Sequence, residues 1–256
     1  MARGSAGETA LQKHLRVLHA FDAKAPYLTL TEIAERAGLA RSTAHRLLAE
    51  LEREGLVERW PDRTYRLGVR LYELASRTPG ALGLRETARP FLIHVQSVVR
   101  QHTQLAVLAG TDVLYIERFS ARESAINHTI LGGRTRIHAS SFGLAMLAHG
   151  PAETVDAVVA SGFAPSFTER TIRSEAELRA MLRRIRADGF AVLEGHIHPA
   201  STGIAVPVYG PHGAVYAAVG VIVPNDGASP LPHVELLRTA AGGITRALER
   251  AAAGEV

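Results

Sequence analysis

The chain has 256 residues, of which 46% are hydrophobic, and a formal net charge of +4. This composition excludes wholesale disorder, and no apolar run approaches the roughly 20 residues that a membrane span requires. The absence of cysteine excludes disulfides, thiol catalysis and thiolate metal sites. Together with a polar N-terminus that lacks the apolar centre of a signal peptide, it predicts a cytoplasmic protein.

The first 78 residues carry 13 basic and 10 acidic side chains, a net charge of +3, and the other 178 carry 16 and 15, a net charge of +1. The basic excess therefore lies in the N-terminal part. It is too small to indicate a nucleic-acid partner without further observations.

Apolar residues recur at helical spacing from Ala10 to Phe21 and predict a first helix that ends before Pro26. A second helix is expected from Thr31, which we assign as its N-cap, with Glu32 and Glu35 in the first turns where the helix dipole favours acidic residues. Gly38 would provide the turn that follows, because glycine readily adopts positive φ.

A third helix is predicted from about Arg41 to Glu54, with a core stripe at helical spacing. Its polar and basic residues lie mostly off that stripe, at its N-terminal end. Two helices joined by a tight turn, the second with polar and basic residues at its N-terminal end, are typical of a helix-turn-helix. This motif places its second helix in the major groove of DNA. Solvated arginines on an ordinary surface helix are the alternative interpretation.

The segments Val57–Trp60 and Thr64–Leu67 flank Pro61-Asp62-Arg63 and predict a short hairpin with a basic tip, a wing. The order of helix, turn, helix and basic hairpin favours DNA binding over a solvated surface. Arg46 would make a bidentate contact to guanine, and Thr31 would add a phosphate contact to its role as cap. The predicted DNA-contacting residues are Thr31, Arg41, Ser42, Thr43, His45, Arg46 and Arg63.

Residues 68–76 predict a helix that packs back on this unit, and the segment from Thr78 to Gly83 breaks the pattern. We therefore expect a DNA-binding domain over residues 1–78 and a second domain over residues 79–256. The second domain would begin with a helical linker from Leu84 to about His102, a position from which such helices often set dimer geometry.

The second domain mixes strands and helices without strict alternation, which predicts an α+β fold. Strands are expected on both sides of Gly110-Thr111-Asp112 and at 190–193, 203–208 and 215–223. Helices are expected at about 140–148, 152–161, 174–188 and 231–252.

At this point the chain resembles the IclR family of bacterial transcription regulators over nearly its whole length. The matching segments are Leu30–Ala34 with Gly38–Leu48, His138–Gly143 with Ala145–Ala148, Arg170–Ile172, and Ile204–Val208. Each segment is weak alone, but their order and spacing are specific. The resemblance implies a winged helix-turn-helix, a helical linker and a GAF-like domain with an antiparallel sheet flanked by helices. It also implies homodimers, often paired into tetramers, on double-stranded palindromic operators.

In such proteins the effector cavity lies between the sheet and the loops around two of these segments. We expect it to bind a small organic effector, with a carboxylic acid as one candidate. The resemblance carries over to Gly133, His138, Ala139, Ser141, Gly143, Met146, Ile204, Ala205 and Val206. Arg134, Glu194 and Gly203 join this set at positions where the polarity of the ligand would be determined.

The chain departs from the family pattern at several positions where the polarity of the ligand would be determined. Arg136 replaces the usual Pro, Leu144 replaces a common Lys, and Gly203 stands where a polar or thiol residue is often found. The acidic cluster that usually follows the Gly-aromatic pair is reduced to Glu194. The family therefore predicts a pocket and leaves its ligand open.

His196-Ile197-His198 would place two imidazoles on one face of a strand, a spacing suitable for a metal, and Glu194 would join that face if the strand continued. With no thiolate, a loop or pocket lining is the favoured interpretation, and no metal or cofactor is predicted. His138 would bond either an effector carboxylate or the backbone. Arg134 and Arg136 would either neutralise an acidic effector or remain solvated. Ser140 and Ser141 would cap a helix, since no catalytic triad accompanies them.

The leading hypothesis is a DNA-binding regulator, a repressor in the first instance, whose operator affinity responds to a metabolite. The alternatives are an enzyme with a DNA-binding appendage, using His138, Glu194 and His196 in a metal or acid–base site, and a nucleoid or scaffolding protein with no effector.

Overall fold

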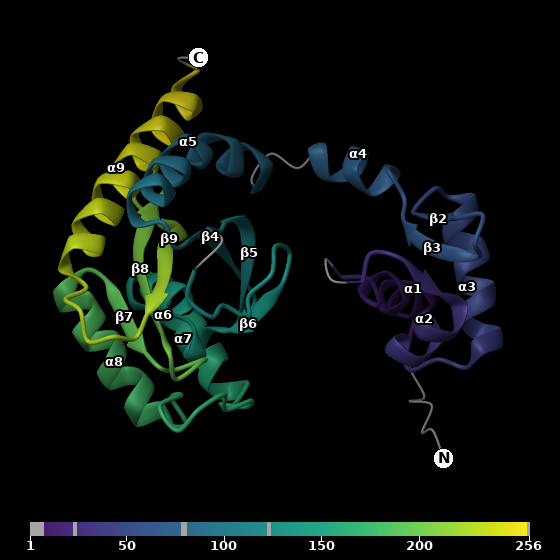
Figure 1. The fold of residues 1–256 in the computed structure, drawn as a ribbon, viewed down its shortest axis with the longest axis horizontal. Helices are drawn as coiled ribbons and strands as arrows, with labels where there is room; N and C mark the ends of the chain where they lie inside the picture. The colour runs from purple at the N-terminus through teal and green to yellow at the C-terminus, as the bar shows by residue number, and fades with distance from the viewer. Residues whose placement is uncertain (1–7, 23–24, 78–80, 122–123, 255–256) are drawn as a thin grey trace. The chain divides into compact units, whose positions relative to one another are not determined.

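The computed structural model describes residues 8–22, 25–77, 81–121 and 124–254. The chain forms two compact units, residues 1–82 and 83–256, called here the N-terminal and C-terminal units. Figure 1 shows the helices and strands of each. None of the helices in the described ranges is long and apolar enough to cross a membrane.

The described part of the N-terminal unit packs helices and a small antiparallel sheet together, and its elements are α1 (Ala10–His19), β1 (Leu28–Thr29), α2 (Leu30–Ala37), α3 (Arg41–Arg53), β2 (Val57–Arg59), β3 (Thr64–Leu67) and α4 (Arg70–Ser76). Within its described residues the sheet order is β1-β3-β2. Val17, Ile33, Leu47 and Leu48 are buried at its centre. The predicted helix-turn-helix with a hairpin wing is confirmed. Strand β1 was not predicted, because two residues are too few to show a strand pattern in the sequence.

Thr29, and not Thr31, is the N-cap of α2, which corrects the prediction. The Thr29 hydroxyl accepts a hydrogen bond from the Glu32 amide at 3.3 Å, and the Glu32 carboxylate accepts one from the Thr29 amide at 2.7 Å. This reciprocal pair is a capping box, which needs threonine three residues before the glutamate. Thr31 lies within the first turn, with its side chain exposed.

The C-terminal unit is built on an antiparallel sheet whose order, in the described part of the chain, is β6-β5-β4-β9-β8-β7. Its strands are β4 (His102–Ala109), β5 (Asp112–Phe119), β6 (Arg134–Arg136), β7 (Ala191–Glu194), β8 (Ser201–Tyr209) and β9 (Val215–Pro224). The predicted α+β class is confirmed. β6 was not expected, because three polar residues carry no strand periodicity.

Helices cover both faces of this sheet (Figure 1). The helices of this unit are α5 (Ala81–Val99), α6 (Ser141–His149), α7 (Ala152–Ala160), α8 (Glu175–Asp188) and α9 (Leu231–Ala253), with a 3-10 turn at Ile137–Ala139 before α6. The residues Leu92, Leu237 and Val219 belong to the core shared by α5, α9 and one sheet face. Phe142 and Leu182 belong to the core on the other face, under α6 and α8.

The linker helix differs from its predicted range at both ends. It begins at Ala81, so Gly83 lies inside the helix, while residues 78–80 of the expected break lie outside the described residues. It ends at Val99 because Arg100 adopts the left-handed conformation, with φ of 52°. His102, the predicted end of the helix, is instead the first residue of β4.

Candidate functional site

The exposed edge of α3 carries the residues predicted to contact DNA. Ala44, Leu47, Leu48 and Leu51 are buried and attach α3 to the core. Turned away from them, at the N-terminal end, the exposed residues are Arg41, Ser42, His45 and Arg46, with Thr43 half-buried. We call these five residues the recognition edge. The structure brings them together on one surface, as a major-groove helix requires.

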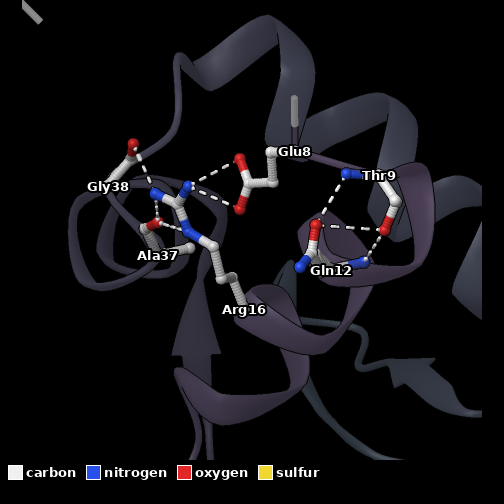
Figure 2. A network of polar contacts seen from close by, with 6 residues as sticks. All are labelled: Glu8, Thr9, Gln12, Arg16, Ala37 and Gly38. Carbon is white, nitrogen blue, oxygen red and sulfur yellow. Dashed lines mark hydrogen bonds and ion pairs between the residues drawn. The ribbon is translucent and has the colours of Figure 1, made fainter. Parts of the chain in front are cut away.

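The turn before α3 depends on Gly38. Its φ of 60° lies in the left-handed region, and it forms the C-cap of α2. Arg16 of α1 donates from Nε to the Ala37 carbonyl oxygen at 2.7 Å and from Nη2 to the Gly38 carbonyl oxygen at 2.8 Å, as Figure 2 shows. Helix α1 therefore holds the turn that sets α2 against α3.

The wing presents Arg63 at its tip in a left-handed conformation, with φ of 67°. The Asp62 carboxylate accepts hydrogen bonds from the Thr64 amide and hydroxyl, at 2.9 and 2.6 Å, and these close the turn. At the base of the wing, the Arg66 guanidinium lies 4.2 Å from the centre of the Trp60 ring. The geometry exposes Arg63 on a rigid hairpin.

The C-terminal unit contains a cavity at the N-terminus of α6, called here the α6 pocket. The space between its walls, including the part open to solvent, is about 410 Å³. Its walls come from β5, β7, β8, β9, the start of α6 and two loops. The lining residues are Tyr115, Ile126, Asn127, His128, Thr129, Ala139, Ser140, Ser141, Phe142, Leu193, His196, Ile197, His198, Ser201, Gly203 and Ile222.

The first turn of α6 forms the polar end of this pocket. Ser140 is the N-cap, and its hydroxyl accepts from the Gly143 amide at 3.4 Å and lies 3.1 Å from the Tyr115 hydroxyl. The next residues, Ser141 and Phe142, line the pocket, and their amides belong to the first turn, whose amides have no partner within the helix. Burial raises the pKa of Tyr115 and keeps its phenol neutral. This end of the pocket offers donors to an anion.

A loop between β5 and β6, residues 124–129, covers the pocket and is fastened by side chains of β4, β8 and Gln101, the residue before β4. Ser201 donates to the Ile126 carbonyl oxygen at 2.6 Å, and Gln101 accepts from the Ala125 amide at 2.7 Å. The Thr129 hydroxyl receives a hydrogen bond from the Gln104 amide group. These bonds connect a pocket-lining residue, Ser201, directly to the covering loop.

The second loop, residues 195–198, follows β7. Strand β7 ends at Glu194, so His196 and His198 lie on bends and not on one face of a strand. Thr171 donates to the His196 carbonyl oxygen at 2.7 Å and Thr168 to that of Gly195 at 2.7 Å. Both histidines line the α6 pocket, and burial lowers the pKa of His196. The pocket-lining interpretation of this histidine pair is confirmed.

Three of the predicted effector residues, Ala139, Ser141 and Gly203, line the α6 pocket. A Cβ on Gly203 would stand 2.7 Å from the Ser141 hydroxyl oxygen, so the missing side chain makes room for that hydroxyl. The residues Gly133, Arg134, His138, Met146, Glu194, Ile204, Ala205 and Val206 are not among its lining residues.

Gly143 is likewise not among the lining residues and is buried in α6. The other eight residues have the following surroundings. Met146, Ala205 and Val206 are buried in the cores. The His138 ring packs edge-on against Phe163, with ring centres 5.5 Å apart. Arg134 is exposed, and Gly133 precedes it at the start of β6.

Glu194 and Ile204 line a separate hollow on the other sheet face, near the start of α9. The Glu194 carboxylate lies 3.3 Å from the Arg170 guanidinium at the surface.

Sequence analysis missed Tyr115, Ser201 and the covering loop at Ile126–Thr129. Tyr115 lies on a strand predicted from its apolar residues, and Ser201 precedes the predicted strand at 203–208, because β8 begins two residues earlier. The loop shows no periodicity, so nothing in the sequence connects it to α6. Within the described residues, no group of three or more His, Asp or Glu side chains is arranged to hold a metal ion.

Two family models match the chain. The bacterial transcriptional regulator IclR C-terminal domain matches residues 78–244, and the IclR helix-turn-helix domain matches residues 10–61. The chain belongs to the IclR family. It is therefore a transcriptional regulator with a DNA-binding helix-turn-helix and a C-terminal effector domain.

Among its relatives, the regulator XynR of Escherichia coli is 28% identical over 243 residues, which are 93% of this chain and 96% of XynR. BhcR of Paracoccus denitrificans is 31% identical over 225 residues, 88% of this chain and 80% of BhcR. A crystal structure of an IclR homolog from Microbacterium hydrocarbonoxydans, in complex with 4-hydroxybenzoate, is 40% identical with a TM-score of 0.85. It covers 94% of this chain and 99% of that chain.

Proposed function

We propose that this IclR-family regulator is a repressor that leaves its palindromic operator when the α6 pocket binds a small aromatic carboxylic acid. The observation that carries the proposal is the pocket itself, in which the start of a helix and buried hydroxyls face apolar walls. Coupling between such sites is typically about 1–3 kcal/mol, which changes operator occupancy about 5- to 150-fold.

The charge of the lining supports an anionic ligand. No Asp, Glu, Lys or Arg appears among the described lining residues. The amides at the start of α6 and the Ser141 hydroxyl would receive a carboxylate, since helix N-termini favour negative charge. His128 and His198, with ring centres 5.5 Å apart, would add donors at another wall.

The walls support an aromatic body on the ligand. Tyr115 and Phe142 pack edge to face with ring centres 5.5 Å apart, and Leu193 and Ile222 lie on the neighbouring strands. Flat apolar surfaces with a few placed polar groups are the usual composition of a ligand site. The Microbacterium homolog, 40% identical, was crystallised with 4-hydroxybenzoate, an acid of this class.

Exposed apolar side chains on and beside α4 support an oligomer that binds a two-fold symmetric operator. Val69, Tyr72 and Leu74 leave 65%, 69% and 50% of their surface exposed on and beside α4. Adjacent apolar side chains of this size usually mark an association surface. A second copy of the chain on this surface would give two recognition edges for two half-sites, and a tetramer would pair two such dimers.

Binding of 4-hydroxybenzoate tests the effector assignment, with 4-hydroxybenzamide as a control that keeps the ring and hydroxyl but loses the charge. We expect the acid to raise the melting temperature by mass action and the amide to leave it unchanged. Ser141→Ala should weaken the response. Equal shifts from acid and amide would contradict the carboxylate assignment.

Regulation is tested on the duplex that the full-length protein selects from a random-sequence library. We expect a palindromic sequence, release when the acid is added, and repression of transcription when this duplex overlaps a promoter. Salt-sensitive binding without sequence preference would contradict the specific regulator.

A further inference from the structure

Arg46 of the recognition edge is held by a neighbour on its own helix. The Arg46 side chain is 65% exposed, and its Nη1 donates to Glu50 Oε1 at 2.7 Å, one turn further along α3. The other carboxylate oxygen, Oε2, lies 2.8 Å from His14 Nε2 of α1. Both oxygens of Glu50 are therefore occupied, one by the DNA-facing guanidinium and the other by a second helix.

His14 is itself fixed at both ring nitrogens. Nδ1 lies 2.8 Å from the Ala10 carbonyl oxygen, and Nε2 faces the Glu50 carboxylate. Because both partners are acceptors, both contacts are hydrogen bonds only when the ring carries two protons. The hydrogen bond from His14 is also the largest cause of the lowered pKa of Glu50, ahead of Arg46.

Helix α1 is a rigid support for this chain of contacts. A capping box between Thr9 and Gln12 closes its N-terminus, and Arg16 binds the last carbonyls of α2 and lies 3.0 Å from the Glu8 carboxylate, as Figure 2 shows. Arg16 and His14 thus anchor α1 to both helices of the helix-turn-helix. The position of Glu50 is consequently set by the fold of the unit and not by α3 alone.

We propose that Glu50, anchored by His14, is a positioning residue that orients the Arg46 guanidinium for a bidentate contact to guanine. The inference rests on the proposed function, in which the recognition edge contacts operator bases. Among the described contacts, Arg46 uses only Nη1 for Glu50, so Nε and Nη2 are available to a base edge. A guanidinium that is already ordered loses less conformational freedom when it binds, and its fixed fork matches the two acceptors of guanine.

The alternative is a surface ion pair with no role in recognition. An exposed pair one turn apart on a helix contributes little to stability. The two interpretations therefore differ in base preference and not in melting temperature. Glu50→Gln also removes a negative charge close to DNA, which by itself would strengthen binding to every sequence.

The experiment uses the full-length protein and the duplex selected by the wild type from a random-sequence library. Base preference at each position is measured by titration at fixed salt for Arg46→Ala, Glu50→Gln and His14→Gln. Glu54→Gln at the C-cap of α3 and His19→Gln on α1 are the matched controls, with the same residue changes outside this chain of contacts. We expect Arg46→Ala to lose the preference for guanine at one position of each half-site.

Glu50→Gln and His14→Gln should weaken that same preference by roughly 2- to 150-fold, the range for coupled neighbours, and leave other positions and the melting temperature unchanged. In the Arg46→Ala background, Glu50→Gln should have no further effect on base preference. A retained guanine preference, equal loss at all positions, or additive effects would overturn the proposal.

Two other results separate this proposal from the function on which it rests. If the wild type selects no sequence, the specific regulator itself is wrong. If a sequence is selected and Arg46→Ala keeps every preference, only the role of Arg46 and its support is overturned. Should Glu50→Gln unfold the N-terminal unit, Glu50→Asp retains the charge with a shorter reach and gives the same test.

Discussion

Gly203 on β8 lies against Ser141 in the first turn of α6. A side-chain carbon on Gly203 would stand 2.7 Å from the Ser141 hydroxyl oxygen and 3.4 Å from its Cβ. The hydroxyl therefore occupies the space that a larger residue on the strand would fill. A strand residue and a helix residue 62 positions apart in the sequence together define the polar end of the α6 pocket.

Gly203→Ala should displace the Ser141 hydroxyl, weaken the response to 4-hydroxybenzoate and cost about 1–3 kcal/mol of unfolding free energy, as overpacking typically does. Adding Ser141→Ala removes the clashing oxygen and should restore stability without restoring the ligand response. Urea denaturation and ligand-induced thermal shift measure the two effects. If the single variant were as stable as the wild type, the close approach would not be as described.

Thr29→Ala should lower the unfolding free energy of the N-terminal unit by about 1 kcal/mol, the usual cost of losing an N-cap. The hydroxyl that caps α2 belongs to Thr29, whose own amide is bound in return by Glu32. Thr31→Ala is the control and should leave stability unchanged while weakening DNA binding if its hydroxyl contacts phosphate. Denaturation and DNA titration of both variants check this, and equal losses of stability would contradict the assigned cap.

Most elements of the fold could be predicted from local patterns. The core stripe of α3 and the break at Gly38 suffice for the helix-turn-helix, because helical period and glycine conformation are local properties. Short elements could not be predicted: β1 and β6 have two and three residues and exist through pairing with β3 and β5. The cap was misplaced by two residues because both threonines precede the same acidic helix start.

The α6 pocket could be predicted only in part. Ala139, Ser141 and Gly203 lie in segments that share a family pattern, whereas Ile126 and Ser201 meet across the pocket through a hydrogen bond between residues 75 positions apart. A contact between residues so far apart leaves no periodic pattern in the sequence. For the same reason the link from His14 through Glu50 to Arg46 needed three-dimensional distances.

Stability should fall as the pH is lowered below about 6.5, the ordinary pKa of histidine. Burial lowers the pKa of His102, His138 and His196 below the ordinary value of 6.5. Between the folded and unfolded pKa values the unfolded chain binds more protons, so the contribution of these groups is present above about 6.5 and is lost as the pH falls towards the folded value.

His138→Gln should flatten this dependence, measured as unfolding free energy in urea at several pH values. His212→Gln, on an exposed turn, is the control. A steeper dependence in His138→Gln would contradict the burial argument.

Gly38→Ala should destabilise the N-terminal unit more than Gly110→Ala destabilises the C-terminal unit. Both glycines have left-handed backbones, with φ of 60° and 66°, which cost a residue with a side chain about 1–2 kcal/mol. At Gly110 nothing lies within 4 Å of an added carbon, so only this backbone cost applies. At Gly38 the added carbon would stand 2.8 Å from Arg16 Nη2 and displace the guanidinium that binds the end of α2.

Gly38→Ala should therefore also weaken operator binding, whereas Gly110→Ala should leave it intact. Urea denaturation and titration with the selected duplex test both parts. If the two variants lost equal stability and both bound DNA like the wild type, Arg16 would not hold the turn, because the only added cost at Gly38 is the displacement of its side chain.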